Sequence, residues 1–217
     1  YSEDIPDELS IGAGVGARLG QEPGVAIYFV WSGDPARAES LIAPLRKAGT
    51  VVAENIEKKD YVAVQRSGDI DDTRAFTGHM KSGFFKSISQ EMIDGLIDNF
   101  EARPERSTRF GFGRMGGAIG RVENSDTAFA HRDANFSMLS FVSWKTGAES
   151  AEHVNYINSH WANVAPYMTG FYVNDYFDQS QAMVNQTYRD NFPRLAKIKK
   201  QYDPTNLFRL NANIQPT

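Results

Sequence analysis

The sequence predicts an α+β fold, in which a layer of β-strands carries helices on one face. Two runs of apolar, β-branched and aromatic residues, at 25–31 and 136–144, are typical of strands. Several other stretches place apolar residues three or four positions apart, as an amphipathic helix requires. In addition, the segments that begin at Phe29 and Phe141 both run from a strand through a tryptophan and a turn into an Ala- and Glu-rich helix. Two copies of one strand–helix unit in a single sheet would explain this echo, and so would chance similarity.

The composition of the chain excludes several classes of protein. Of its 217 residues, 41% are hydrophobic, which is enough for a core, and a net charge of −4 with mixed acids and bases offers no basic surface for nucleic acid or an anionic membrane. Nothing approaches the run of about 18 apolar residues that a transmembrane helix needs. The absence of cysteine excludes disulfides and thiol chemistry. This composition fits the cytoplasm without excluding export, and no signal peptide is expected from the start at Tyr1.

Residues 1–24 are predicted to be a polar, Gly-rich segment that leads into the sheet. Within it, residues 12–17 read GAGVGA, which matches a relaxed dinucleotide-binding fingerprint. That fingerprint needs a buried strand before the first glycine and a crossover helix after the last. The preceding residues, DIPDELSI, are too polar for a central strand, and too few residues follow before the next strand. We therefore expect a loop at 12–17 and a buried strand at 25–31.

Two helices are predicted in the first half of the chain. The first spans 35–48, with Asp34 as its cap and Pro35 at its first position. The second begins near Ser87, where Gln90 completes a capping box. The apolar stripe of the first helix consists of Ala38, Leu41, Ile42 and Leu45, and that of the second of Met92, Ile93, Leu96, Ile97 and Phe100.

The second half of the chain is predicted to alternate strands and helices. Residues 107–122 are interpreted as two strands joined at a Gly-rich corner, and a long strand follows at 136–144. The next helix has a buried stripe of Val154, Ile157, Trp161 and Val164. The tail is predicted to hold a short strand at 171–174 and helices at 180–190 and 193–202, the last ending at an Asp-Pro pair.

Other short motifs do not indicate a function of their own. The HRD at 131–133 resembles a kinase catalytic loop, but the downstream asparagine and a phosphate loop are missing. The four histidines show no helical pairing with a neighbouring carboxylate, so no metal site is expected, and no Gly-x-Ser-x-Gly elbow indicates a hydrolase. The residues alone fit half of a cofactor enzyme and, equally well, a non-enzymatic α+β binding or dimerisation module.

The C-terminal tail carries a long motif. It reads FYVN from Phe171 and YRDNFPRLAKIKKQYDPTNLF from Tyr188, and it closes with Ile214. Upstream, a glycine pair at 116–117 precedes DTAFAHR, which ends at Arg132. These motifs resemble the closing segment, the glycine corner and a strand approach of the berberine bridge enzyme family, which contains FAD-dependent oxidases and dehydrogenases. The stretch WSGDPARAESLIAPLRKAG is similar to the first helix of the family's substrate domain.

The resemblance implies an FAD-dependent oxidoreductase that transfers a hydride from a small organic substrate to flavin N5, with oxygen as acceptor. In the family's layout an N-terminal portion holds most of the FAD, a middle region forms an antiparallel sheet over the flavin ring, and the tail returns to the FAD portion. The chain then divides into a substrate-binding α+β sheet domain at 25–168 and a C-terminal helical cap at 169–217. We expect the chain alone to be inactive, because the N-terminal FAD-binding portion of the same protein would be missing.

The resemblance also implies the residues that meet the flavin. Asn174 matches a position near the isoalloxazine ring, with Tyr172 supporting it, so both are expected to contact FAD. The carboxylate that several plant members carry on the strand before a conserved tryptophan corresponds to Ser137, which is not a strong base. Asp175 stands where those enzymes have a tyrosine. We expect Asp175 to be the catalytic base, since burial beside an apolar ring can raise a carboxyl pKa, and a solvated loop acid is the alternative.

One face of the strand at 136–144 is expected to bind the substrate. Side chains along a strand alternate between its two faces. Asn135, Ser137, Leu139 and Phe141 therefore share a face, and we expect this face to be open to solvent when the FAD-binding portion is absent.

Overall fold

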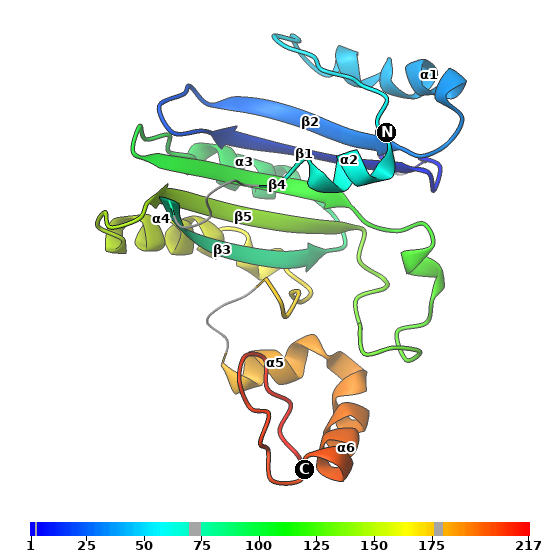
Figure 1. Ribbon diagram of the computed structural model, residues 1–217, viewed down its shortest axis with the longest axis vertical. Helices are drawn as coiled ribbons and strands as arrows, with labels where there is room; N and C mark the ends of the chain where they lie inside the picture. The colour runs from blue at the N-terminus through cyan, green and yellow to red at the C-terminus, as the bar shows by residue number, and fades with distance from the viewer. Residues whose placement is uncertain (3, 70–74, 176–179) are drawn as a thin grey trace.

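The computed structural model describes residues 1–2, 4–69, 75–175 and 180–217. Within these residues the centre is a five-stranded sheet in the order β2-β1-β4-β5-β3, and all neighbours are antiparallel (Figure 1). The strands are β1 (Leu9–Ala17), β2 (Gly24–Trp31), β3 (Phe76–Phe85), β4 (Arg106–Arg114) and β5 (Phe136–Lys145). The predicted α+β class with an antiparallel sheet is confirmed.

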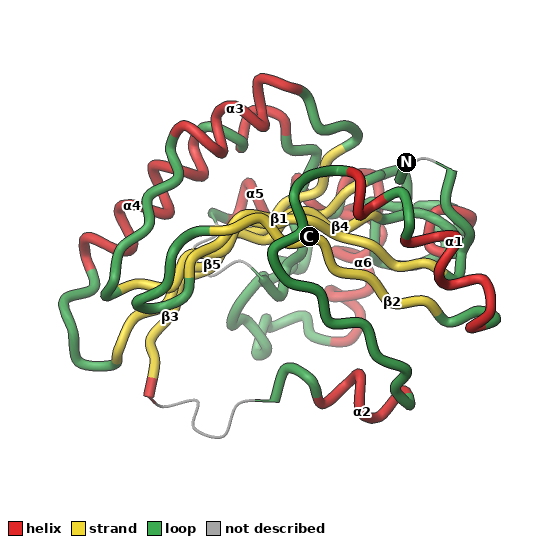
Figure 2. Tube along the Cα trace, turned by 90° about the horizontal axis from the view of Figure 1, so that it is seen from above, coloured by secondary structure: helices red, strands yellow, loops and turns green. Residues whose placement is uncertain are grey.

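The helices lie on both sides of the sheet and beyond its two edge strands (Figures 1 and 2). The α-helices of the described chain are α1 (Ala38–Ile42), α2 (Tyr61–Arg66), α3 (Gln90–Asp98), α4 (Ala151–Ala162), α5 (Gln181–Thr187) and α6 (Phe192–Tyr202). Figure 2 shows α3 and α4 over the same face of the sheet. In Figure 1, α5 and α6 form a C-terminal cap beyond the β3 side. None of the described helices has the length and apolarity to cross a membrane.

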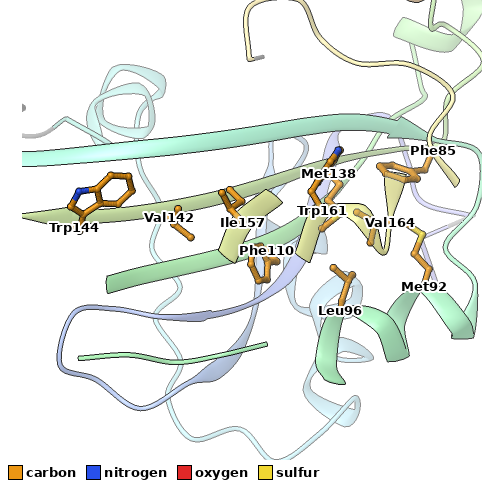
Figure 3. Close-up of a cluster of buried hydrophobic side chains, with 10 residues drawn as sticks. All are labelled: Phe85, Met92, Leu96, Phe110, Met138, Val142, Trp144, Ile157, Trp161 and Val164. Atoms are coloured by element: carbon orange, nitrogen blue, oxygen red, sulfur yellow. The ribbon is translucent and has the colours of Figure 1, made fainter. Parts of the chain in front are cut away.

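Alternation along β5 decides which side chains enter the core. Met138, Val142 and Trp144 are at most 2% exposed and belong to a cluster between the sheet and the helices (Figure 3). The other members of this cluster are Phe85, Met92, Leu96, Phe110, Ile157, Trp161 and Val164. Since burying one large apolar side chain contributes about 1.5–3 kcal/mol, this layer is a major source of stability.

A charged side chain completes the packing between β4 and α4. Arg106 has no exposed surface, and its guanidinium carbon lies 3.7 Å from the ring centroid of Tyr156 on α4. Its Nε donates to Thr108 Oγ1 at 3.1 Å, and a terminal nitrogen lies 3.3 Å from the Glu101 carboxylate. These partners offset the cost of removing a cation from water, which would otherwise be several kcal/mol.

The prediction of a loop at 12–17 is wrong. These residues belong to β1, which lies between β2 and β4 in the sheet. The sheet therefore begins at Leu9, within the segment that was expected only to lead into it. Leu9, Ile11 and Ala17 point towards the helix side and are at most 8% exposed, and the glycines alternate with them. The sequence LSIGAGVGA thus carries a strand period of two, which its glycine content concealed.

The strand at 25–31 is confirmed as β2, but its predicted burial is wrong. β2 is an edge strand, and Val25, Ile27 and Val30 are 79%, 40% and 46% exposed. Helix α4 packs on β5 and β3, at the other end of the strand order. A continuous apolar run therefore does not distinguish a central strand from an edge strand.

The first two predicted helices are both present with altered limits. Asp34 caps the first as predicted, since its carboxylate accepts from Ala36 N at 3.0 Å, but the segment breaks into short turns around α1 and buries only Ile42. The second helix is capped by Ser89, whose Oγ accepts from Met92 N at 3.3 Å, so the capping box at Ser87 is wrong.

Two predicted strands are also corrected. The region 107–122 contains the single strand β4, followed by a loop with a short 3-10 turn at Ile119–Arg121. Residues 171–174 form no strand, and the chain there pairs with β3 only through a bridge between Gly170 and Phe84. Strand β3 and helix α2 were not predicted.

The internal echo has a partial counterpart in the structure. Trp31 is the last residue of β2 and Trp144 the last but one of β5. These two strands lie at equivalent positions on either side of the adjacent β1 and β4. The helices that follow differ, because α4 packs against the sheet and buries four residues, whereas α1 buries only Ile42. The two halves therefore correspond in their strands and differ in their helices.

Candidate functional site

The face of the sheet opposite α3 and α4, called the open face below, carries the predicted substrate residues. On β5 it is lined by Ser137, Leu139 and Phe141, and Leu139 is 37% exposed whereas its neighbour Met138 is 1% exposed. Asn135 is exposed just before the strand, and its amide donates to the carbonyl of Lys86 at 2.8 Å. The structure thus brings three of the four residues onto one uncovered surface, with Asn135 at its end.

Glycines allow a tyrosine of β2 to cross the open face. Gly12 of β1 faces Tyr28 on one side and Gly113 on the other. The Tyr28 ring lies directly over Gly12, where a Cβ would be 2.2 Å from it, and its hydroxyl donates to the carbonyl of Phe112 at 3.3 Å. Any side chain at position 12 would displace this ring. Tyr28 was not among the predicted site residues, although alternation along β2 places it on the same face as Val30 and opposite to Val25.

Arg109 of β4 meets Tyr28 on the same face. Its guanidinium carbon lies 5.5 Å from the Tyr28 ring centroid, a cation–π distance. In the strand register Arg109 lies between Gly16 of β1 and Phe141 of β5. The open face therefore has a cation and an aromatic ring on one side and the apolar side chains of β5 on the other.

The predicted flavin contacts lie in a turn beside β3. The Asp175 N–H donates to the Tyr172 carbonyl at 3.0 Å, which closes the turn. Tyr172 and Asn174 are exposed, and the Asn174 amide donates to the Tyr172 hydroxyl at 2.8 Å. The two predicted ring contacts are thus held together as one polar group at the surface.

Asp175 has the properties of a candidate base. Its side chain is half-buried, and this burial raises the pKa of its carboxyl group. The turn that holds it follows Gly170, which bridges Phe84, and Phe84 is paired across β3 and β5 with Ser137. Asp175 therefore comes five residues after the point at which the tail bridges β3.

His131 joins the sheet to the C-terminal cap. Its side chain is 2% exposed, and its ring stacks on Phe84 with the centroids 4.8 Å apart. Nε2 donates to the carbonyl of Thr187 in α5 at 2.8 Å, and the Thr187 hydroxyl in turn donates to the Phe171 carbonyl at 2.8 Å. The HRD motif therefore forms a hydrogen-bonded corner between the sheet and the cap.

Further polar contacts fix the cap around this corner. Arg189 and Lys86 pair with Asp133 at 2.6 and 3.3 Å. The Asn191 amide donates to the carbonyl of Asn124 at 2.6 Å. Together these contacts hold the start of α6 against the segment that leads into β5.

The Asp-Pro turn that ends α6 is structural, as its chemistry predicts. The carboxylate of Asp203 accepts from the N–H groups of Leu207 and Phe208 at 2.7 and 3.0 Å and pairs with Lys199. The hydrogen bond from Lys199 holds the pKa of Asp203 below its usual value. The turn therefore directs the last residues back along the helix.

The His131 corner predicts a pH-dependent stability. Burial lowers the pKa of His131 to about 4, and the charge of Arg189 acts in the same direction. A histidine whose pKa is lower in the folded state binds fewer protons there than in the unfolded chain, so stability is complete above the unfolded pKa and falls as the pH drops from about 6.5 towards about 4. We expect His131→Gln to reduce the slope of the unfolding free energy against pH in urea titrations. His160, whose pKa burial also lowers, is kept in both proteins, and equal slopes would contradict the prediction.

Fold and site together define an α+β sheet domain with one covered and one open sheet face and a helical cap. A sequence model of the family described as berberine and berberine like matches residues 171–215. The FAD-linked oxidoreductase YgaK of Bacillus subtilis is 26% identical over 186 residues, which are 85% of this chain and 41% of YgaK. The (R)-6-hydroxynicotine oxidase of Paenarthrobacter nicotinovorans is 25% identical, covering 98% of this chain and 48% of the oxidase. The solved structure of BBE-like #28 from Arabidopsis thaliana superposes with a TM-score of 0.80 at 16% identity, over 100% of this chain and 52% of that one.

Residues 171–215 match the berberine and berberine like family, as the tail motif predicted, and the rest of the chain is similar to relatives named FAD-linked oxidoreductase or berberine bridge enzyme-like. It spans about half the length of the curated relatives it matches. The relatives named above are FAD-linked oxidoreductases or oxidases.

Proposed function

We propose that the protein is an FAD-dependent oxidoreductase that takes a hydride from a small organic substrate, and that the open face forms one wall of its substrate site. The observation that carries this proposal is the open face itself, a sheet surface with mixed polar and apolar side chains that α3 and α4 leave uncovered. A bound flavin would supply the hydride acceptor at N5, with oxygen as the electron acceptor. The family relationship supports the flavin class.

The residues of this chain fit one side of an FAD site. The Tyr172 hydroxyl and the Asn174 amide are exposed and can hydrogen-bond to the edge of a flavin ring. The stretch at 12–17, which could have cradled the phosphates, is part of β1. Most of the FAD is therefore held by an N-terminal portion of the same protein.

The C-terminal cap offers a surface for that portion. Four large apolar side chains after and at the end of α6 are strongly exposed: Tyr202 at 78%, Leu207 at 70%, Phe208 at 79% and Leu210 at 85%. A cluster of exposed apolar residues typically marks a contact surface. This surface supports docking of the cap on the FAD-binding portion.

Asp175 and the side chains of the open face then have distinct roles. Asp175 takes a proton from a hydroxyl or amine of the substrate while the hydride leaves the adjacent carbon. Ser137, Leu139 and Phe141, with Asn135 at the end of the strand, orient the substrate. An absorption spectrum of the full-length protein tests the flavin class. Flavin bands are expected, and their absence would favour the non-enzymatic binding module.

The chain of 217 residues alone is expected to bind FAD weakly or not at all. Its flavin contacts are limited to Tyr172 and Asn174, and a ligand raises stability by RT ln(1 + [L]/Kd) only if it binds. Micromolar FAD should therefore leave the melting temperature unchanged, whereas the same FAD added to flavin-depleted full-length protein should raise it. A saturating shift of the short chain would show that it holds a complete site.

A further inference from the structure

The open face is cationic. Among the strand residues that the structure describes, its charged side chains are Arg109 of β4 and Lys145 at the end of β5, and neither Asp nor Glu occurs on this side of the strands. Arg109 is exposed, and in the described part of the chain no carboxylate forms an ion pair with it. Its guanidinium donors are therefore available to a ligand.

The contacts around Arg109 hold it in place over the face. The Tyr28 ring, fixed by its hydrogen bond to the Phe112 carbonyl, lies 5.5 Å from the guanidinium carbon. Gly16, the β1 partner of Arg109, has no side chain that could cover the arginine stem. Because such contacts restrict a side chain before a ligand arrives, less conformational entropy is lost on binding.

If the open face is the wall of a substrate site, Arg109 lies in that site, so the inference rests on the proposed function. A guanidinium that is removed from water without a counter-charge costs several kcal/mol. A carboxylate is the counter-charge that fits best, since its two oxygens match the fork of the guanidinium. Phe141 lies opposite Arg109, and Leu139 lies opposite Gly111, so an apolar surface adjoins the cation.

We propose that the substrate is an organic acid with an apolar body. Its carboxylate pairs with Arg109 beside Tyr28, and its body lies on Leu139 and Phe141. Arg109 is thus a specificity-determining residue, which selects for charge and leaves the redox step to other groups.

Benzoate and benzamide test this charge selection, because they share a shape and differ in charge. Binding of each to the full-length protein is measured by calorimetry at low salt. Benzoate is expected to bind at least about tenfold more tightly than benzamide, and added salt should reduce this preference. Equal affinities, or no binding of benzoate at millimolar concentration, would overturn the proposal.

Three variants assign the preference to Arg109. Arg109→Gln should abolish it, and Arg109→Lys should keep part of it, because lysine retains the charge and loses the fork. Lys145→Gln removes the other cation of the open face and should leave the preference unchanged. A preference that survives in Arg109→Gln, or that disappears in Lys145→Gln, would contradict the assignment. The comparison of the two ligands with the unaltered protein remains decisive if a variant does not fold.

The proposed function and this inference can fail separately. A protein with flavin bands that does not prefer benzoate would retain the proposed function and overturn the carboxylate. A protein without flavin bands that prefers benzoate through Arg109 would retain the anion site and overturn the oxidoreductase.

Discussion

Asp175→Asn in the full-length protein is expected to slow reduction of the bound flavin by substrate at least about a hundredfold, which corresponds to roughly 2.7 kcal/mol of barrier. Asparagine has nearly the same shape as aspartate but cannot accept the substrate proton. Asp175 suits this task because burial raises the pKa of its carboxyl, and it directly follows the proposed flavin contact Asn174. Anaerobic single-turnover kinetics measure the rate, and the flavin content should be unchanged.

Ser137→Ala is the matched control for this experiment. Ser137 stands where the resemblance to plant members of the family implies a carboxylate. Because Ser137 is proposed to orient the substrate and not to accept its proton, we expect its loss to slow reduction far less than the loss of Asp175. The unaltered protein should also show a rate that rises with pH as Asp175 loses its proton, and Asp175→Asn should lack this dependence. If Asp175→Asn reduced its flavin within about threefold of the unaltered rate, the base would have to lie in the N-terminal portion.

Gly170→Ala is expected to lower the free energy of unfolding by about 1–3 kcal/mol, as overpacking of a buried site does. A Cβ at position 170 would lie 2.0 Å from Cε1 of His131. The ring cannot easily yield, because it is stacked on Phe84 and hydrogen-bonded to Thr187. Either the ring leaves its place or the bridge from Gly170 to Phe84 opens, and both loosen the cap from the sheet. Thermal unfolding measures the loss of stability, and limited proteolysis should show faster cleavage around the cap.

Gly24→Ala provides the comparison for this prediction. A Cβ at Gly24 meets no atom within 4 Å, so the change should stay within about 0.5 kcal/mol. A double mutant gives a second check, since Gly170→Ala should cost less when His131→Ala has already removed the ring. Equal stability of Gly170→Ala and Gly24→Ala would show that the His131 corner does not hold the cap.

The sequence by itself determined the elements with strong periodicity. Strand β5 and helices α4 and α6 were predicted close to their observed positions, because alternation of two and spacings of three and four are properties of the local chain. The same alternation predicted that Ser137, Leu139 and Phe141 share one face of β5, and this face is the open one. The run of residues around Asp203 indicated the resemblance to the family, whose model matches residues 171–215. The carboxylate of Asp203 closes the turn after α6.

Only the tertiary structure determined the strand order and the contacts that the side chains on each face of the sheet make. The prediction of a loop for GAGVGA was wrong, because glycine inside a strand is unfavourable unless a neighbour must approach closely. At Gly12 that neighbour is the ring of Tyr28, which belongs to another strand, so the local sequence does not show it. The apolar run at 25–31 is exposed because β2 is at the edge of the strand order and α4 packs on β5 and β3 at the other end. The meeting of Arg109 with Tyr28 depends on the order of β2, β1 and β4. Strand order is set by contacts between distant parts of the chain, and for this reason no local pattern contained it.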